Sequence, residues 1–366
     1  MLTAETLAES RRSMEICNAC RYCEGYCAVF PAMELRREFA RGDLVQLANL
    51  CHDCRGCFYA CQYAPPHEFA LNLPKAFAEL RAQTYAEYAW PRAFGALFAR
   101  NGMVVSLSTA GCITLLLIVA AWLQSPLIAP PQVGPGAFYR VIPEWAMLVV
   151  AGGTFAFSIL ALTIGARRFW RDSGPAAPVA WADVRAAGRD LATLRNLGGG
   201  GHGCNDLDEK FSNARRRFHH AMFYGFALCF ASTVTAAFYE HILGRVSPYP
   251  IFSLPVVLGT VGGLALTIGT AGFLWLRLAA DREPASRALR GGGYALLVQL
   301  LLTAVTGLLL LVFRATSAMA ILLAVHLGVV LSFFVTMPYG KFVHGIYRSA
   351  ALLRNAQRSR VEGGLS

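Results

Sequence analysis

The sequence has few charged residues for its length, and this shortage is the first clue to its class. Asp, Glu, Lys and Arg make up 15% of the 366 residues, and 55% are apolar, whereas an ordinary soluble domain has about 25% charged residues. A wholly soluble chain is therefore excluded, and much of the protein is expected to lie in lipid. The net charge of +11 is not gathered in a basic stripe with aromatic residues, which excludes a nucleic-acid partner.

The N-terminus also lacks the apolar segment of a secretory signal peptide. Its first residues, MLTAETLAESRRSMEIC, carry charges but no apolar run, so this segment is expected to stay in the cytosol. Disulfides are rare in that compartment. Of the 11 cysteines, eight lie within the first 61 residues. Metal ligation therefore explains them better than disulfide bonding.

Six apolar runs follow the first 100 residues, and each is close to the roughly 20 residues that a helix needs to cross the hydrocarbon core. They lie at residues 103–124, 145–165, 220–240, 251–276, 293–313 and 318–338. We therefore predict three parts: a soluble domain at 1–100, a six-helix transmembrane domain at 101–350 with a cytosolic loop at 166–218, and a basic cytosolic tail at 351–366.

Arginines border these runs on one side of the membrane. They are Arg167, Arg168, Arg171, Arg215, Arg216, Arg217, Arg277, Arg282, Arg287, Arg290, Arg348, Arg354, Arg358 and Arg360. With six crossings, all of them fall on the side of the N-terminal domain. The positive-inside rule therefore predicts a multi-pass protein with both termini in the cytosol.

Two cysteine runs of identical spacing occupy the soluble part. They are Cys17-x2-Cys20-x2-Cys23-x3-Cys27 and Cys51-x2-Cys54-x2-Cys57-x3-Cys61. This is the bacterial ferredoxin pattern, in which three thiolates of one run bind one [4Fe-4S] cluster and the fourth binds the other cluster. We therefore predict two [4Fe-4S] clusters with crossed ligands. Group one is Cys17, Cys20, Cys23 and Cys61, and group two is Cys51, Cys54, Cys57 and Cys27.

Two structural zinc sites are the alternative interpretation of these cysteines. The proline that usually follows the fourth cysteine is missing, because Ala28 and Gln62 occupy those places. Structural zinc sites, however, use pairs of cysteines separated by a long gap. Four cysteines within eleven residues are more typical of a cubane. The predicted fold is mainly α, with an N-terminal bacterial-ferredoxin-like two-cluster domain and a six-helix transmembrane bundle.

Histidines near the membrane helices are candidate axial ligands of one or two b-type haems. The five candidates are His219, His220, His241, His326 and His344. His326 and His344 are 18 residues apart, which is five turns, or about 27 Å, on a continuous helix. Pairing by depth places His219 or His220 opposite His344 and His241 opposite His326. Pro338 would break this geometry if it kinks the helix.

A role as helix anchors remains open for most of these histidines. Only His326 lies deep enough in an apolar run for a bare imidazole to be costly. Cys204 and His52 belong to no second motif, so we interpret them as loop residues or as surroundings of the clusters. The stretch LGGGGHGCND at 197–206 satisfies G-x-G-x-x-G but has no strand before it and no helix after it, and a flexible loop is favoured over a nucleotide site.

Three segments closely resemble the tricarballylate-utilisation protein B family, also called citrate-utilisation protein B. They are residues 16–74, which hold both cysteine runs, RRRFHHAMFYGFALCFAS and LLAVHLGVVLSFFVTMPYGKFVHGIYR. The resemblance implies a bacterial inner (cytoplasmic) membrane protein and a partner, an FAD-dependent dehydrogenase called protein A, which oxidises tricarballylate. The chain would pass electrons from the reduced FAD through two [4Fe-4S] clusters and b-type haem to the membrane quinone pool.

The same family likeness leaves other roles open. A related flavoprotein fusion, a monooxygenase of cobalamin synthesis acting on precorrin-3, contains a comparable iron–sulfur and haem half. A self-contained quinone-reducing or monooxygenase enzyme would need a haem with an open axial site, and a membrane-anchored redox sensor would need only the clusters. No residue of this chain is assigned a catalytic role, and we expect an oxidoreductase subunit rather than a complete enzyme.

Overall fold

The computed structural model describes residues 2–123, 131–174, 177–286 and 289–362. Within them the chain is helical, and the only strand-like pairing is an isolated bridge between Cys204 and Ser212. The N-terminal domain contains α1 (Ala4–Cys20), α2 (Val29–Glu34), α3 (Arg41–Leu50), α4 (Gly56–Tyr59) and α5 (Leu73–Tyr88). The 3-10 segment η1 (Arg92–Arg100) leads into the membrane helices.

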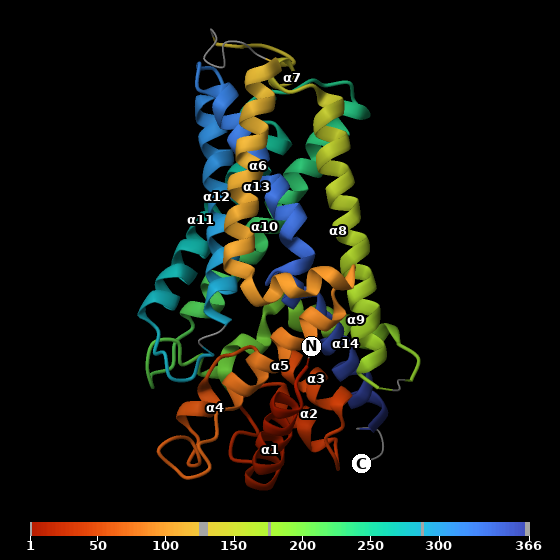
Figure 1. The fold of residues 1–366 in the computed structure, drawn as a ribbon, viewed down its shortest axis with the longest axis vertical. Helices are drawn as coiled ribbons and strands as arrows, with labels where there is room; N and C mark the ends of the chain where they lie inside the picture. The colour runs from red at the N-terminus through yellow and green to blue at the C-terminus, as the bar shows by residue number, and fades with distance from the viewer. Residues whose placement is uncertain (1, 124–130, 175–176, 287–288, 363–366) are drawn as a thin grey trace.

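Six of the described helices are long and apolar enough to cross a membrane, which confirms the predicted number. They are α6 (Asn101–Leu123), α8 (Glu144–Asp172), α10 (Ala214–His241), α11 (Leu254–Ala279), α12 (Arg290–Phe313) and α13 (Met319–Thr336). The short helix α7 (Ala137–Val141) lies at the end of the bundle away from the N-terminal domain (Figure 1).

Both termini lie at the same end of the bundle. The N-terminal domain, α9 (Trp181–Thr193) and α14 (Val343–Glu362) gather there (Figure 1). The 3-10 segment η2 (Arg195–Gly201) follows α9 within the long loop before α10. Of the arginines expected on this side, Arg287 lies outside the described residues.

Close helix contacts in the bundle depend on glycine. A Cβ at Gly225 of α10 would lie 2.5 Å from the backbone nitrogen of Leu266, and one at Gly262 of α11 would lie 2.8 Å from that of Cys229. These contacts bring the two backbones together, as small residues do in membrane helices. By contrast, α10 meets α13 through larger side chains, including the rings of Phe226 and Phe333, whose centroids are 5.7 Å apart.

The N-terminal domain is packed onto the bundle. One hydrophobic core includes Leu47 of α3, Phe77 of α5, Phe169 of α8 and Leu352 of α14. Asp43 accepts from Arg358 of α14 at 2.7 Å. A continuous buried core of this kind holds the cysteine loops in a defined position relative to the membrane helices.

The sixth membrane helix is not continuous with the helix that carries His344. α13 ends at Thr336, and a 3-10 turn over Met337–Tyr339 and an extended Gly340 precede α14. Pro338 has no backbone N–H and cannot continue the helical hydrogen bonding. The prediction that His326 and His344 lie five turns apart on one continuous helix is therefore wrong.

The basic segment that we predicted as a tail is, up to Glu362, part of α14. Ala351 and Leu352 are buried, and Arg354 is 1% exposed. The guanidinium of Arg354 lies 3.9 Å from the centroid of the Trp170 ring and donates to Trp170 O at 2.8 Å. These contacts attach the C-terminal helix to the end of α8.

Candidate iron–sulfur and haem sites

The first cysteine run begins on the last turn of α1. Cys17 and Cys20 lie on that turn, and Arg21 ends the helix in the left-handed conformation, with φ 54°. The Arg21 N–H donates to Cys17 O at 2.8 Å. The chain then reverses and brings Cys23 to the same side, so the helix end presents three thiols to one space.

The second run begins where α3 ends. Cys51 caps the helix, and Asp53 and Arg55 both have positive φ, 56° and 64°. These two residues tighten the turn and aim backbone N–H groups inward, as a nest does. The Asp53 N–H lies 3.4 Å from Cys51 Sγ. The turn leads into α4, which carries Cys57.

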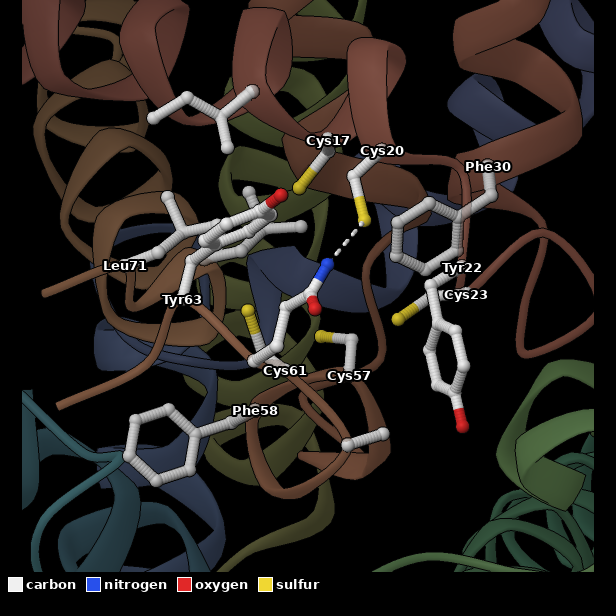
Figure 2. A pocket seen from close by; sticks show the side chains of 14 residues that line it. Cys17, Cys20, Tyr22, Cys23, Phe30, Cys57, Phe58, Cys61, Tyr63 and Leu71 are labelled. Atoms are coloured by element: carbon white, nitrogen blue, oxygen red, sulfur yellow. Dashed lines mark hydrogen bonds between the residues drawn. The ribbon is translucent and has the colours of Figure 1, made fainter. Parts of the chain in front are cut away.

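The eight cysteines line two adjoining cavities. The first, about 480 Å³ and partly open to solvent, is lined by all of group one together with Cys57. Figure 2 shows the sulfur atoms of Cys17, Cys20, Cys23 and Cys61 directed into this space. The second cavity, about 330 Å³, is lined by all of group two. Cys57 lines both cavities, and the other seven cysteines divide between them as in the two crossed sets. The assignment of four ligands to each cluster stays a prediction.

The wall between the cavities is thin, because Phe30, Cys57 and Leu73 line both. Phe30 and Leu73 are apolar, and both are buried. Groups bound in the two cavities would therefore be neighbours, separated by a few apolar side chains.

The cysteine side chains do not converge on a single-ion site. Among the described residues, no three His, Cys, Asp or Glu side chains converge closely enough to ligate one metal ion. A zinc ion needs its thiolates at about 2.3 Å from a common centre. A cubane instead takes each thiolate on a different iron, so its four sulfur ligands stand apart. The cysteine arrangement fits cubanes better than zinc.

Two thiols of group one, Cys17 and Cys23, are costly to ionise without a metal. Burial, followed by the neighbouring thiolates, raises the pKa of Cys17 and of Cys23 to about 12. Metal ligation deprotonates thiols and supplies the positive charge that these side chains lack. A hydrogen bond from Cys204 instead lowers the pKa of Cys54 to about 7.

Sequence reasoning did not assign Cys204 a partner, yet the structure places it against group two. Cys204 is fully buried in a small cluster with Cys54, Leu194 and Leu197, and the Asn205 N–H donates to Cys54 O at 2.9 Å. The glycine-rich loop therefore covers a cysteine site, which supports its interpretation as surroundings of the clusters. A cysteine directly after a glycine run was the available signal.

Three histidines lie between group two and the membrane helices. His52 Nδ1 donates to Leu50 O at 2.7 Å, and His344 Nδ1 donates to Lys341 O at 2.5 Å. A backbone carbonyl on Nδ1 fixes the tautomer and leaves Nε2 free for a metal. Burial, followed by the charge of Arg348, holds the pKa of both rings well below the ordinary value, so both are neutral, as metal ligands must be.

The third histidine of this set, His219 on α10, has a buried Nδ1 that finds no hydrogen-bond partner among the described residues. A buried polar atom with no partner is costly unless a ligand or water satisfies it. Its neighbour His220 is stacked on Tyr224, with ring centroids 6.0 Å apart. Of the two residues proposed to face His344, His219 is therefore the better candidate.

The other predicted pair, His241 and His326, is less well formed. His326 Nδ1 lies 3.0 Å from Thr306 Oγ1 on α12, whereas His241 Nδ1 lies 3.6 Å from Glu144 Oε1 at the start of α8, with its side chain 46% exposed. The two histidines have different neighbours, and His326 is seven residues inside α13 while His241 is the last residue of α10. Their pairing stays a prediction.

Comparisons with known proteins cover almost the whole chain. Residues 97–364 match the family model described as "Citrate utilization protein B", and residues 10–87 match the model described as "Citrate utilization protein B Fer4-like domain". The Citrate utilization protein B of Escherichia coli is 49% identical over 367 residues, a match that covers 98% of this chain and 94% of that protein. No solved structure matches.

Proposed function

The chain belongs to the citrate utilization protein B family, and from this premise we propose that it is a membrane electron-transfer subunit. It carries electrons from the reduced FAD of a partner dehydrogenase, through two [4Fe-4S] clusters and b-type haem, to the quinone pool of the bacterial inner membrane. The single observation that carries the proposal is that the eight cysteines line two adjoining cavities, one lined by all of group one and the other by all of group two, with Cys57 lining both.

Each group holds one cubane, which when bound accepts and releases one electron at a time. The cysteines fix the position of the two clusters, because α1, α3 and α4 are held in the hydrophobic core of the domain. Phe30 and Leu73 exclude water from the wall between the cavities. Two neighbouring one-electron sites without a substrate pocket between them are suited to relay.

Electrons enter at group one. All four of its cysteines are partly exposed, whereas Cys51 and Cys54 of group two are buried. Tyr22, which lines the first cavity, is 69% exposed and offers a flavoprotein an apolar contact. Oxidation of the partner's reduced FAD releases two electrons and two protons, so the chain takes up the two electrons in two successive transfers.

Electrons leave group two toward the membrane. We propose that His219 of α10 and His344 of α14 would hold a haem near this end of the bundle. A haem held by two histidines would supply electron transfer rather than oxygen binding. His326 is the candidate ligand of a second haem deeper in the membrane. Two electrons and two protons convert a quinone to a quinol, which balances the oxidation of the flavin.

The substrate of the partner follows from the family name. The relative is named for citrate utilization, and we propose a dehydrogenase acting on a tricarboxylate, tricarballylate being the candidate that the resemblance implies. This chain then supplies the electron outlet and no substrate chemistry. Substrate recognition belongs to the flavoprotein.

Quinone reduction by the reconstituted pair tests the proposal. The full chain in proteoliposomes is mixed anaerobically with the flavoprotein partner, its tricarboxylate substrate and a short-chain ubiquinone, and quinol formation is followed. The wild-type chain should support quinol formation, and Cys20→Ser should abolish it. Equal rates with the two chains would overturn the relay. Intact clusters with no quinol formed would instead favour a redox sensor.

A further inference from the structure

The two cysteine groups differ in the hydrogen bonds that reach their sulfur atoms. In group two, the Asp53 N–H lies 3.4 Å from Cys51 Sγ. This donor comes from the backbone, two residues after its cysteine, so the fold itself maintains it.

Group one has weaker support within the described residues. The donor to a group-one sulfur there is the side-chain amide of Gln62, whose Nε2 lies 3.8 Å from Cys20 Sγ (Figure 2). Gln62 is exposed, so this bond competes with water. Hydrogen bonds to the sulfurs and solvent exposure are among the factors that set the potential of an iron–sulfur cluster.

Cationic side chains from three helices converge on the group-two loop. Cys51 O accepts from Arg81 of α5 at 3.2 Å and from Arg348 of α14 at 2.7 Å. Asp53 O accepts from Arg215 of α10 at 2.5 Å. Guanidinium groups from α5, α10 and α14 therefore bind the group-two loop.

Two carboxylates offset part of this positive charge. Asp206 is 2.6 Å from Arg215, and Asp53 lies within the loop itself. Arg81 and Arg348, however, bind backbone carbonyls. Burial by itself disfavours an added negative charge, but the same low dielectric strengthens the attraction of each cation and each donor.

Cys204 adds a donor from outside the ferredoxin-like domain. Its thiol donates to Leu197 O at 3.3 Å and is packed against Cys54 in the same buried cluster. When Cys54 is a metal-bound thiolate, it is the stronger acceptor of the two, because charged acceptors form the stronger hydrogen bonds. The glycine-rich loop thus delivers a thiol donor to one ligand of group two.

We propose that group two holds the more easily reduced cluster, and that Cys204 and the arginines on residues 51–53 set this order. The proposal rests on the proposed function, because it needs a cluster in each group. An electron that enters at the exposed group one would then move downhill to group two, on the side of His52 and the membrane helices. Cys204, Arg81, Arg215 and Arg348 are positioning residues for this transfer.

An EPR-monitored redox titration of the purified full chain in detergent tests the order, and it requires neither the partner nor quinone. Cys27→Ser should alter the signal that appears at the higher potential, and Cys61→Ser the signal at the lower potential. The reverse assignment, with both clusters present, would overturn the proposal. Absence of both cluster signals would instead count against the proposed function.

Variants outside the ligand set test the cause of the order. In Cys204→Ala, the share of the electron on group one relative to group two should rise at least tenfold. This corresponds to a change of about 59 mV in the difference between the two cluster potentials for a one-electron couple. Cys204→Ser retains a donor, so it should show only a small part of this shift. Arg348→Gln keeps a donor for Cys51 O but removes the charge, and should shift the electron in the same direction. Unchanged potentials in both Cys204→Ala and Arg348→Gln would contradict the proposed cause.

Discussion

The two cysteine groups have the same ligand spacing but different surroundings. Group one is partly exposed, and Tyr22 and Gln62 line its cavity. Group two lies against the membrane helices, covered by the loop that holds Cys204 and bound by arginines of α5, α10 and α14. Identical motifs can therefore hold clusters of different potential, because the neighbouring elements rather than the cysteines determine the electrostatics.

The two cysteine groups also differ in their position in the molecule. The exposed group is open to a soluble donor, and the buried group is next to His52, His219 and His344. The docking of the N-terminal domain on α8 and α14 keeps this order, since Asp43 and the continuous core fix the domain against the bundle. In the function that we propose, group one is the entrance for electrons, group two is the intermediate site and these histidines form the outlet.

The largest expected effect would come from breaking the crossed ligation. Cys61→Ser should remove or alter the same EPR signal as Cys17→Ser, although the two residues lie in different runs, because both line the first cavity. Cys27→Ser should likewise match Cys51→Ser. Iron content should fall by about half if the altered cluster is lost. A match of Cys61→Ser with Cys51→Ser instead would show that each run binds its own cluster.

Histidine variants test the proposed haem site next to group two. His344→Ala should remove the b-type absorbance of the haem near group two while the cluster EPR signals remain, because His344 Nδ1 is already held by Lys341 O and its Nε2 is free to bind iron. His241→Ala, at an exposed position beside Glu144, is the matched control and should keep that absorbance. Full haem absorbance in His344→Ala would remove this residue from the ligand set.

The two groups should also differ, by a smaller factor, in how fast reagents from the solvent destroy their clusters. Ferricyanide and an iron chelator should bleach group one several-fold faster than group two, because the first cavity opens to solvent and two cysteines of the second are buried. The two losses can be followed by EPR signals assigned with the cysteine variants. Equal rates would show that exposure does not distinguish the two sites.

The smallest expected effect concerns the exposed hydrogen bond of group one. Gln62→Leu removes the amide donor to Cys20 Sγ and should lower the potential of group one slightly, which widens the gap between the clusters. The change should stay below that of Cys204→Ala, since the Gln62 bond is long and shared with water. A larger potential shift in Gln62→Leu than in Cys204→Ala would show that the Gln62 donor has the stronger effect of the two.

Much of the architecture was predictable from local patterns. Six apolar runs predict six membrane helices because each is long enough to span lipid, and the cysteine spacing predicts crossed sets because of how a helix end and a loop wrap a cubane. The break at Pro338 was foreseen only as a risk. The sequence could not show that the chain resumes as a separate helix that packs back onto α3 and α9.

Contacts between distant segments were beyond the sequence. Cys204 lies 150 positions after Cys54, and no periodicity joins a glycine-rich loop to a ferredoxin-like turn. The partner carbonyls of Arg81, Arg215 and Arg348 likewise depend on how α5, α10 and α14 are arranged around residues 51–53. Local spacing encodes the ligands, whereas the tertiary fold determines what surrounds them.

The most direct test of the account is the iron and acid-labile sulfide content of the anaerobically purified chain, with an oxidised and a dithionite-reduced optical spectrum of the same sample. The account predicts about eight irons and eight sulfides in clusters, together with sharp α-bands of b-type haem. Zinc without sulfide would contradict the central claim. Iron and sulfide without the α-bands would leave the clusters and exclude the haem outlet.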